Sequence, residues 1–293
     1  MKIFFIGTVE FSYIALEALI NSGHQVIGVA TKESSEFNSD FKDLTPLCVN
    51  NNVPYKFVKD INHENNIDFI KSFEPDIIYC FGWSSLIKNE LLNLAKFGVV
   101  GFHPALLPLN KGRHPIIWAL ALGLEQTGSS FFIMDEGADS GDIISQKVVN
   151  ISKEDDAFSL YNKIIKIAIP QILDFTKEFE EGKVMFKKQP ITLGNNWRKR
   201  GKSDGRIDFR MNSQTIFNLV RALSKPYVGA HIETNEGDIK VFESKIIECE
   251  FKNIEPGKIL ELESNWVKVK TADSAIWLKL EIKPDQLFNY SYL

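Results

Sequence analysis

Cysteine is scarce in this sequence, with three among 293 residues. Cys48, Cys80 and Cys249 lie far apart and form neither a CxxC pair nor the close spacing of a disulfide framework. A surplus of basic residues is also missing, because the net charge is −4. The cysteine pattern favours buried thiols in a reducing compartment, and the charge weighs against nucleic acid binding, although a local basic patch stays open.

Long apolar runs and several familiar catalytic motifs are absent as well. The opening residues MKIFFIG are too few for the apolar part of a signal peptide and far too few for a membrane span. This predicts a cytoplasmic protein with no membrane partner. The sequence has no P-loop, GxSxG or HExxH motif, and its first loop has Gly7 alone in place of GxGxxG. His24, His63 and His231 lack metal-ligand spacing, so we expect no metal.

Apolar runs alternate with amphipathic segments through the first half of the chain. Residues 2–6 and 24–31 are predicted strands, and residues 11–21 are a predicted helix between them. This order predicts a parallel, right-handed crossover unit. Residues 157–181 predict a long amphipathic helix, which Pro170 should kink or divide in two. The pattern favours an α/β fold with a Rossmann-like, mostly parallel sheet.

The composition changes after residue 185. Residues 186–204 contain the basic cluster RKRGK (198–202) together with glycine and proline, which indicates an interdomain linker. Residues 205–293 begin with a predicted helix, which short β-branched runs and turn residues follow. These runs predict a small antiparallel, OB-like barrel or a sandwich. The expected organisation is therefore a catalytic domain over 1–185, the linker, and a C-terminal domain over 205–293.

The stretch from Gly101 to Lys147 holds the densest set of reactive side chains. His103 follows the apolar run FGVVGF (97–102), and ligands of open parallel sheets bind beyond the carboxyl ends of the strands. An imidazole with an ordinary pKa of about 6.5 suits proton transfer, and Asp142 in a turn could orient it. The residues alone leave open whether His103 and Asp142 meet, or whether each only satisfies its own loop.

Four segments resemble the folate-dependent formyltransferases, and the likeness covers most of the chain. These enzymes transfer a formyl group from N10-formyltetrahydrofolate to an amine. HPALLPLNKGRHPIIWAL and TGSSFFIMDEGADSGDI resemble the family's active-site segments, and KIFFIGTVEFSYIALEAL is similar to its first strand and helix. DGRIDFRMNSQTIFNLVRALSKPYVGA is similar to the start of the C-terminal domain that methionyl-tRNA formyltransferases share with several nucleotide-sugar N-formyltransferases.

The resemblance implies roles for the reactive residues. His103 matches the family's catalytic histidine and Asp142 its catalytic aspartate. The family has an asparagine two residues before the histidine, where its amide stabilises the oxyanion, and this chain has Gly101. Loss of one such donor typically costs about 100- to 1000-fold in rate. A backbone N–H, Asn110, His114 or water would have to replace it, or the enzyme is slow or has changed its reaction.

The resemblance also implies a binding region for the folate co-substrate. The pterin ring is expected against the loops 81–86 and 134–139, whose backbone groups and apolar walls suit a flat heteroaromatic ring. The expected contacts are Phe81, Gly82, Trp83, Leu86, Met134, Asp135, Gly137 and Asp139.

The segment after His103 bears on the identity of the amine acceptor. KGRHPIIW, with Arg113 and Trp118, resembles the nucleotide-sugar enzymes more than the Arg-Gly-Ala-Ala-Pro-Ile-Gln-Arg expected of methionyl-tRNA formyltransferases. The first hypothesis is N-formylation of a dTDP- or UDP-linked amino-deoxy sugar for lipopolysaccharide or O-antigen synthesis, with Arg113, Trp118 and Thr8 as substrate contacts. The alternatives are methionyl-tRNA formylation and a degenerate formyltransferase that only binds. A homodimer is expected by analogy alone.

Overall fold

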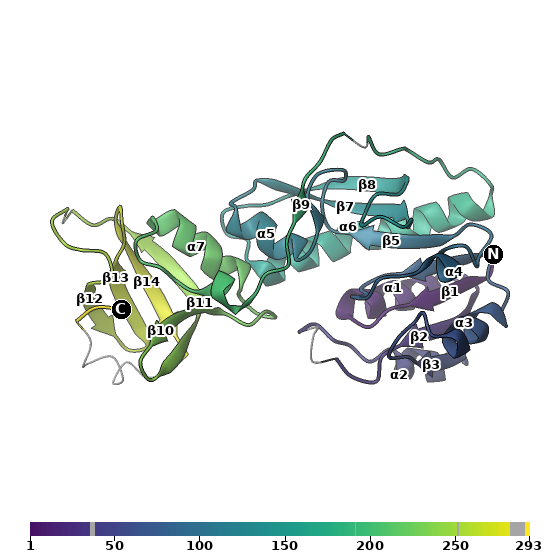
Figure 1. Ribbon diagram of the computed structural model, residues 1–293, viewed down its shortest axis with the longest axis horizontal. Coiled ribbons are helices and arrows are strands. Elements are labelled where there is room, and N and C mark those ends of the chain that lie inside the picture. Colours follow the sequence, from purple (N-terminus) through teal and green to yellow (C-terminus); the bar gives the residue numbers. More distant parts are fainter. Residues whose placement is uncertain (36–38, 191, 251, 282–290) are drawn as a thin grey trace. The chain divides into compact units, whose positions relative to one another are not determined.

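The computed structural model describes residues 1–35, 39–190, 192–250, 252–281 and 291–293. Two compact units make up the chain (Figure 1). The first consists of residues 1–112, 128–149 and 163–197, and the second of residues 113–127, 150–162 and 198–293. The second unit thus takes two segments from the middle of the sequence, which no sequence pattern indicated. The boundaries expected at residues 185 and 205 stay a prediction.

A seven-stranded sheet forms the first unit, in the order β3-β2-β1-β4-β5-β7-β8. Neighbouring strands from β3 to β5 pair in parallel, and β7 is antiparallel to β5. The strands are β1 (Ile3–Ile6), β2 (Val26–Thr31), β3 (Tyr55–Phe57), β4 (Ile77–Cys80), β5 (Val99–His103), β7 (Gln126–Ile133) and β8 (Ile143–Asn150). The predicted mostly parallel, Rossmann-like sheet is confirmed.

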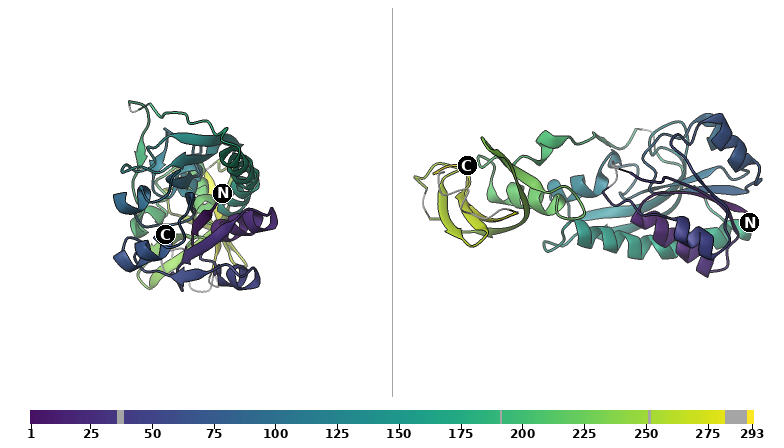
Figure 2. Two further views of the ribbon diagram at one scale, coloured as in Figure 1. Left: turned by 90° about the vertical axis from the view of Figure 1, so that its right-hand side faces the viewer. Right: turned by 90° about the horizontal axis from the view of Figure 1, so that it is seen from below.

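The central strands are apolar at every position because helices cover both of their faces. Helices α1 (Glu10–Asn21) and α6 (Ala157–Glu180) lie on one face, and α3 (Glu64–Lys71) and α4 (Asn89–Leu92) lie on the other (Figure 2). A further short helix, α2 (Thr45–Asn50), precedes β3. Side chains alternate accordingly: Phe4 packs in the cluster that contains Ile70 and Leu91, while Tyr79 contacts Phe175 of α6.

Helix α6 continues through Pro170 as one helix of 24 residues, and is not divided in two. Tertiary packing holds it on both sides of the proline. Ile164 and Phe175 are each 1% exposed, and Ala168 and Ile172 are fully buried. Burial of a large apolar side chain stabilises a fold by about 1.5–3 kcal/mol, so a few such residues offset the cost of about 3 kcal/mol for a proline inside a helix.

The second unit contains the predicted antiparallel sheet. Its five strands run in the order β10-β11-β14-β13-β12, and every neighbouring pair is antiparallel. They are β10 (Ala230–Thr234), β11 (Gly237–Ile247), β12 (Ile259–Glu263), β13 (Trp266–Lys270) and β14 (Ala275–Leu280). Asn212 caps the start of helix α7 (Ser213–Ala222), because its side chain accepts a hydrogen bond from the Thr215 N–H at 2.9 Å.

Helix α5 (Pro115–Ala121) packs against α7 in this unit. Arg221 of α7 donates hydrogen bonds to the Ser152 and Asp155 carbonyls, each at 3.1 Å, which ties residues 150–162 to the same unit. A short 3₁₀ turn, η1 (Lys202–Gly205), precedes α7, and the two-residue strands β6 (Lys111–Gly112) and β9 (Asn196–Trp197) pair in the first unit. Among the described residues, no helix is both long and apolar enough to cross a membrane.

Candidate active site

The His103 ring ends strand β5 and is held at both of its nitrogens. The side chain is 5% exposed. Nε2 lies 2.7 Å from the Asn110 carbonyl oxygen, and Nδ1 lies 3.4 Å from Oδ2 of Asp139. Because a carbonyl oxygen only accepts, Nε2 must carry a hydrogen in this arrangement. Nδ1, beside a carboxylate, is therefore the atom at which the ring can gain or lose its other proton.

Asp139 is the carboxylate that the fold brings to His103. It adopts a left-handed backbone conformation, with φ of 55°, which aspartate tolerates better than most residues. The N–H of Gly112 donates to Oδ2 of Asp139 at 2.9 Å. The sequence had suggested Asp139 only as a folate contact, so its place beside the histidine was missed. The motif DEGADSGD offered four carboxylates and no local signal to choose among them.

Asp142 lies three residues further along, where β8 begins. Its backbone carbonyl accepts a hydrogen bond from the Ile133 N–H at 2.9 Å. Throughout the described ranges, its carboxylate makes no hydrogen bond and no ion pair. The structure thus pairs His103 with Asp139, and the catalytic role suggested for Asp142 stays a prediction.

Gly101 lies two residues before His103 on the same face of β5. A Cβ atom built at Gly101 would lie 2.8 Å from Cγ of Met134 and 3.0 Å from Cζ of Phe132. Met134 therefore occupies the space that an asparagine side chain would need. Of the two side chains considered as replacement donors, Asn110 lies next to the ring through its backbone, whereas His114 belongs to the second unit.

The predicted folate loops lie at the ends of β4 and β7. The Phe81 side chain is fully buried in an aromatic cluster, 5.3 Å between centroids from Tyr79, so it can serve a ligand only through its backbone. Gly82 has φ of 65°, and a Cβ there would lie 2.2 Å from Val9. Leu86, in contrast, is 69% exposed.

Two buried polar atoms without a hydrogen-bond partner among the described residues, and one cation, lie at or near the first of these loops. The indole N–H of Trp83 is buried and has no hydrogen-bond partner among the described residues, and the Lys32 ammonium lies 4.9 Å from the ring centroid. The hydroxyl of Thr8, after β1, is likewise buried and unpartnered within the described chain. A buried donor without a partner costs about 1–3 kcal/mol, which a heteroaromatic ligand with acceptor atoms would recover.

The second of the two loops predicted to bind folate, residues 134–139, is held by side chains of the same turn. Oδ1 of Asp135 accepts hydrogen bonds from the Gly137 N–H at 3.0 Å and from the Ser140 hydroxyl at 2.6 Å. A Cβ on Gly137 would lie 2.0 Å from that hydroxyl. Asp135 and Gly137 therefore shape the loop that carries Asp139.

Two of the three predicted sugar contacts, Arg113 and Trp118, belong to the second unit, and the third, Thr8, belongs to the first. Arg113 is exposed, and the His114 backbone after it is left-handed, with φ of 57°. Burial, followed by the positive charges of Arg113 and Arg200, lowers the pKa of His114. Trp118 donates its indole N–H to the Arg198 carbonyl at 3.0 Å, and the Arg200 guanidinium lies 4.5 Å from its ring centroid.

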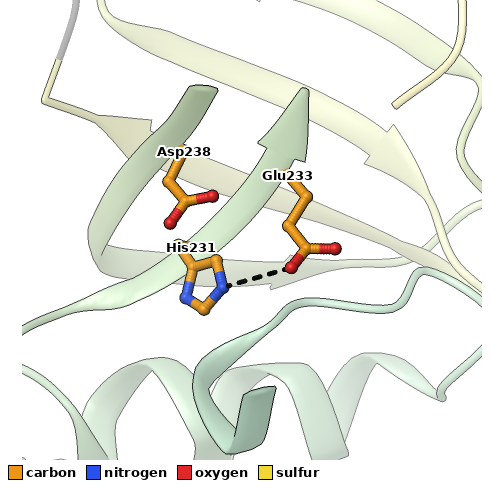
Figure 3. A group of neighbouring side chains, drawn as sticks. All are labelled: His231, Glu233 and Asp238. Atoms are coloured by element: carbon orange, nitrogen blue, oxygen red, sulfur yellow. Dashed lines mark ion pairs between the residues drawn. The ribbon is translucent and has the colours of Figure 1, made fainter. Parts of the chain in front are cut away.

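A third group of ionisable side chains lies on the β10–β11 hairpin (Figure 3). Nε2 of His231 is buried, lies 3.9 Å from Oε1 of Glu233, and has no hydrogen-bond partner among the described residues. Burial is the main cause that lowers the pKa of His231. However, Lys202 lies 2.7 Å from Asp238, and Arg206 lies 3.3 Å from Glu233. Both carboxylates already have a cation, so this group does not support a metal site.

Comparison with known proteins identifies the family of this chain. The formyl transferase model matches residues 1–173, and the model of the formyl transferase C-terminal domain matches residues 199–287. A methionyl-tRNA formyltransferase of Sulfurihydrogenibium sp. (strain YO3AOP1) is 30% identical over 286 residues, which is 96% of this chain and 91% of that protein. One of Clostridioides difficile (strain 630) is 31% identical over 284 residues, 95% of this chain and 91% of that protein.

Solved structures share the fold at lower identity. The N-formyltransferase from Helicobacter canadensis, in complex with folinic acid and dTDP-3-aminofucose, is 18% identical with a TM-score of 0.71, over 96% of this chain and 99% of that one. A variant of HypX from Aquifex aeolicus is 20% identical with a TM-score of 0.70, over 95% of this chain. The match spans only 45% of HypX. Since both family models match and a relative shares 30% identity over nearly its whole length, the chain belongs to the formyl transferase family.

Proposed function

We propose that this protein transfers the formyl group of N10-formyltetrahydrofolate to the amine of a nucleotide-linked amino-deoxy sugar, for the synthesis of a surface glycan. The observation that carries the formyl-transfer part is the buried His103 ring between Asp139 and the Asn110 carbonyl. This arrangement keeps a hydrogen on Nε2 and places a carboxylate beside Nδ1, where it can stabilise a ring that takes up a second proton. It lies at the carboxyl end of β5, where an open parallel sheet binds its ligand.

The reaction needs one proton transfer and no covalent enzyme intermediate. The lone pair of a neutral amine attacks the formyl carbon, and a C–N bond forms while the carbonyl oxygen takes up negative charge. The bond from carbon to N10 then breaks, and the proton that the amine loses reaches N10. We assign this proton transfer to the His103 ring, with Asp139 stabilising its charged form. The loops 81–86 and 134–139 would hold the folate.

The choice of a small acceptor is supported by how the basic cluster 198–202 is used. Arg198 donates to Asp204 at 2.8 Å, and Lys202 lies 2.7 Å from Asp238. Arg200 packs on Trp118 and also donates to the Asp204 carbonyl. Cations held in this way are poorly placed to track a nucleic acid backbone, which requires several phosphate contacts at once. A nucleotide sugar needs only one or two such contacts, and Arg113 is our candidate for them.

Methionyl-tRNA formylation is the second candidate. Support for it comes from the two curated relatives described above, which are methionyl-tRNA formyltransferases. They match at about 30% identity over 95–96% of this chain. The Helicobacter canadensis neighbour, which binds a dTDP-linked amino sugar, matches over a similar length at 18% identity. Sequence identity to the curated relatives thus favours tRNA as the acceptor. The internally paired cations of the basic cluster favour a nucleotide sugar.

Formyl transfer can be followed directly by mass spectrometry. The purified chain would be incubated with N10-formyltetrahydrofolate and either dTDP- and UDP-linked amino sugars or methionyl-charged initiator tRNA. We expect a formyl-sized mass gain on a sugar nucleotide. A gain on tRNA alone would establish the second candidate, and folate binding without any transfer would mean that the chain only binds.

The role of the carboxylate is tested by Asp139→Asn. We expect kcat to fall on the order of 10²- to 10⁴-fold, the usual contribution of a positioned acid–base group, with little change in the KM for folate. Asp142→Asn, measured beside it, decides between the two carboxylates. A larger loss for Asp142→Asn would overturn the assignment of Asp139. His103→Asn should abolish formyl transfer. Its control is His63→Asn, which removes an exposed ring and leaves asparagine, a residue that caps helices well, at the start of α3.

A further inference from the structure

The segment that follows α6 contacts both loops that hold the His103 ring. We call residues 187–190 and 192–197 the strap. Lys187 and Ile143 exchange two backbone hydrogen bonds of 2.8 Å, so the strap begins along β8, an edge strand of the sheet (Figure 1). It ends in β9, which pairs in parallel with β6. The sequence had suggested that this segment was part of a linker.

Gln189 connects the strap to the Asp139 loop. Its Nε2 donates to the Asp139 carbonyl at 3.0 Å and to the Gly141 carbonyl at 2.7 Å. The residue is 8% exposed, and its Oε1 has no hydrogen-bond partner among the described residues. Both acceptors are carbonyls, so only the amide nitrogen can serve them. Among the described residues, the hydrogen bonds of the Gln189 side chain therefore all go to the loop that carries Asp139.

Asn195 connects the strap to the other partner of His103. Its Oδ1 accepts a hydrogen bond from the Asn110 N–H at 2.8 Å, and its backbone carbonyl accepts one from the Lys111 N–H at 3.1 Å. Gly194, just before it, has φ of 119°, and a Cβ there would lie 2.2 Å from the Pro108 carbonyl oxygen. The strap therefore lies directly against the loop whose Asn110 carbonyl accepts from Nε2 of His103.

We propose that the strap positions the catalytic ring: Gln189 places the Asp139 carboxylate at Nδ1, and Asn195 places the Asn110 carbonyl at Nε2. Neither residue reaches the ring, so both are positioning residues that act through their loops. The inference rests on the proposed role of His103 in formyl transfer. The Gly112 N–H, which donates to Asp139, links the two loops to each other.

The first test needs no substrate. In the full chain with ¹⁵N-labelled histidine, the ring shifts of His103 report which nitrogen is protonated, and exchange with water reports how well the Nε2 proton is held. We expect Asn195→Ala to speed this exchange about two- to tenfold, the fold-change of one typical hydrogen bond. Asn195→Asp keeps the acceptor and should restore slow exchange. Asn196→Ala, the exposed neighbour, is the matched control.

The second test uses the formyl-transfer reaction. Gln189→Met keeps the side-chain length and removes both donated hydrogen bonds. We expect it to lower kcat about tenfold or more in the parent chain, with little change in the KM for folate, and by less than about twofold in an Asp139→Asn background. Lys188→Met, at the exposed neighbouring position, should change neither quantity.

Equal losses from Gln189→Met in both backgrounds would overturn the proposal, because they would indicate a general structural effect. The same holds if Asn195→Ala leaves the exchange of the Nε2 proton unchanged. Unfolding midpoints measured for every variant separate loss of stability from loss of positioning. If no amine is formylated by the parent chain, the proposed function fails, while the exchange experiment still decides whether the strap holds the ring.

Discussion

The neighbours of the His103 ring make its two nitrogens chemically distinct. A carbonyl at Nε2 and a carboxylate near Nδ1 are chemically different partners, so the two nitrogens cannot exchange roles without breaking a contact. Gly101 is the second residue at which chemistry and packing meet. Its missing side chain is matched by Met134 and Phe132, which close the space above the strand. An asparagine at this position would therefore clash with the side chains that surround Gly101.

Restoring an asparagine at this position should be costly. Gly101→Asn is expected to reduce the free energy of unfolding by about 1–3 kcal/mol, because the new side chain must displace Met134. The cost should shrink in a Met134→Ala background, where the space is open. Urea unfolding of the four chains of this double-mutant cycle measures the coupling. Identical costs in both backgrounds would show that Met134 does not occupy the asparagine's place.

The segment between α6 and α7 contains two elements of different character. Its first half, the strap, is held by the first unit, and its second half, around η1, is held by the second. Asp204 organises the η1 turn: Oδ2 accepts from the Arg198 side chain at 2.8 Å and from the Gly201 N–H at 2.7 Å. These hydrogen bonds, with the Arg198 bond the largest cause, hold the pKa of Asp204 well below its usual range.

This lowered pKa predicts an acid-sensitive turn. A carboxyl group whose pKa is lower in the folded state contributes stability above its unfolded pKa of about 3.9, and that contribution is lost as the pH falls towards the folded value. Asp204→Asn should therefore be less stable than the parent at pH 7 and converge with it at low pH. Urea unfolding followed by tryptophan fluorescence tests this. A stability difference that is constant with pH would contradict it, and Glu236→Gln, exposed in the hairpin turn, serves as the control.

Charge is the property of the whole molecule that bears on the acceptor. The chain carries 34 basic and 38 acidic residues, and several cations of the one basic cluster are paired internally. Such a protein offers little long-range attraction to a polyanion. The two candidate acceptors differ most in this respect, since tRNA presents many phosphates and a nucleotide sugar only two.

The salt dependence of catalysis distinguishes the two acceptors. With a nucleotide sugar, we expect kcat/KM to fall no more than about tenfold between 50 and 200 mM salt. With tRNA, six to ten phosphate contacts would lower affinity by about 10³–10⁵ over the same range. Initial rates at four salt concentrations suffice, with the conductivity of each reaction recorded. A steep decline with a sugar substrate would show that more cations are engaged than Arg113 and its neighbours supply.

The sequence by itself determined the sheet and the family, and it singled out His103 as the candidate histidine. Runs such as IFFI and VVGFH predict buried strands because hydrophobic periodicity is a local property, and His103 follows from its place at a strand end. Only the tertiary structure decided which carboxylate meets the ring. Asp139 and Asp142 share one motif, and Asp139 is the one that lies beside the ring. It stands in a left-handed turn, and its carbonyl accepts a hydrogen bond from Gln189, 50 residues away in the sequence. Composition predicts only a linker for the segment that contains Gln189, because hydrogen bonds between residues so far apart in the sequence leave no local pattern.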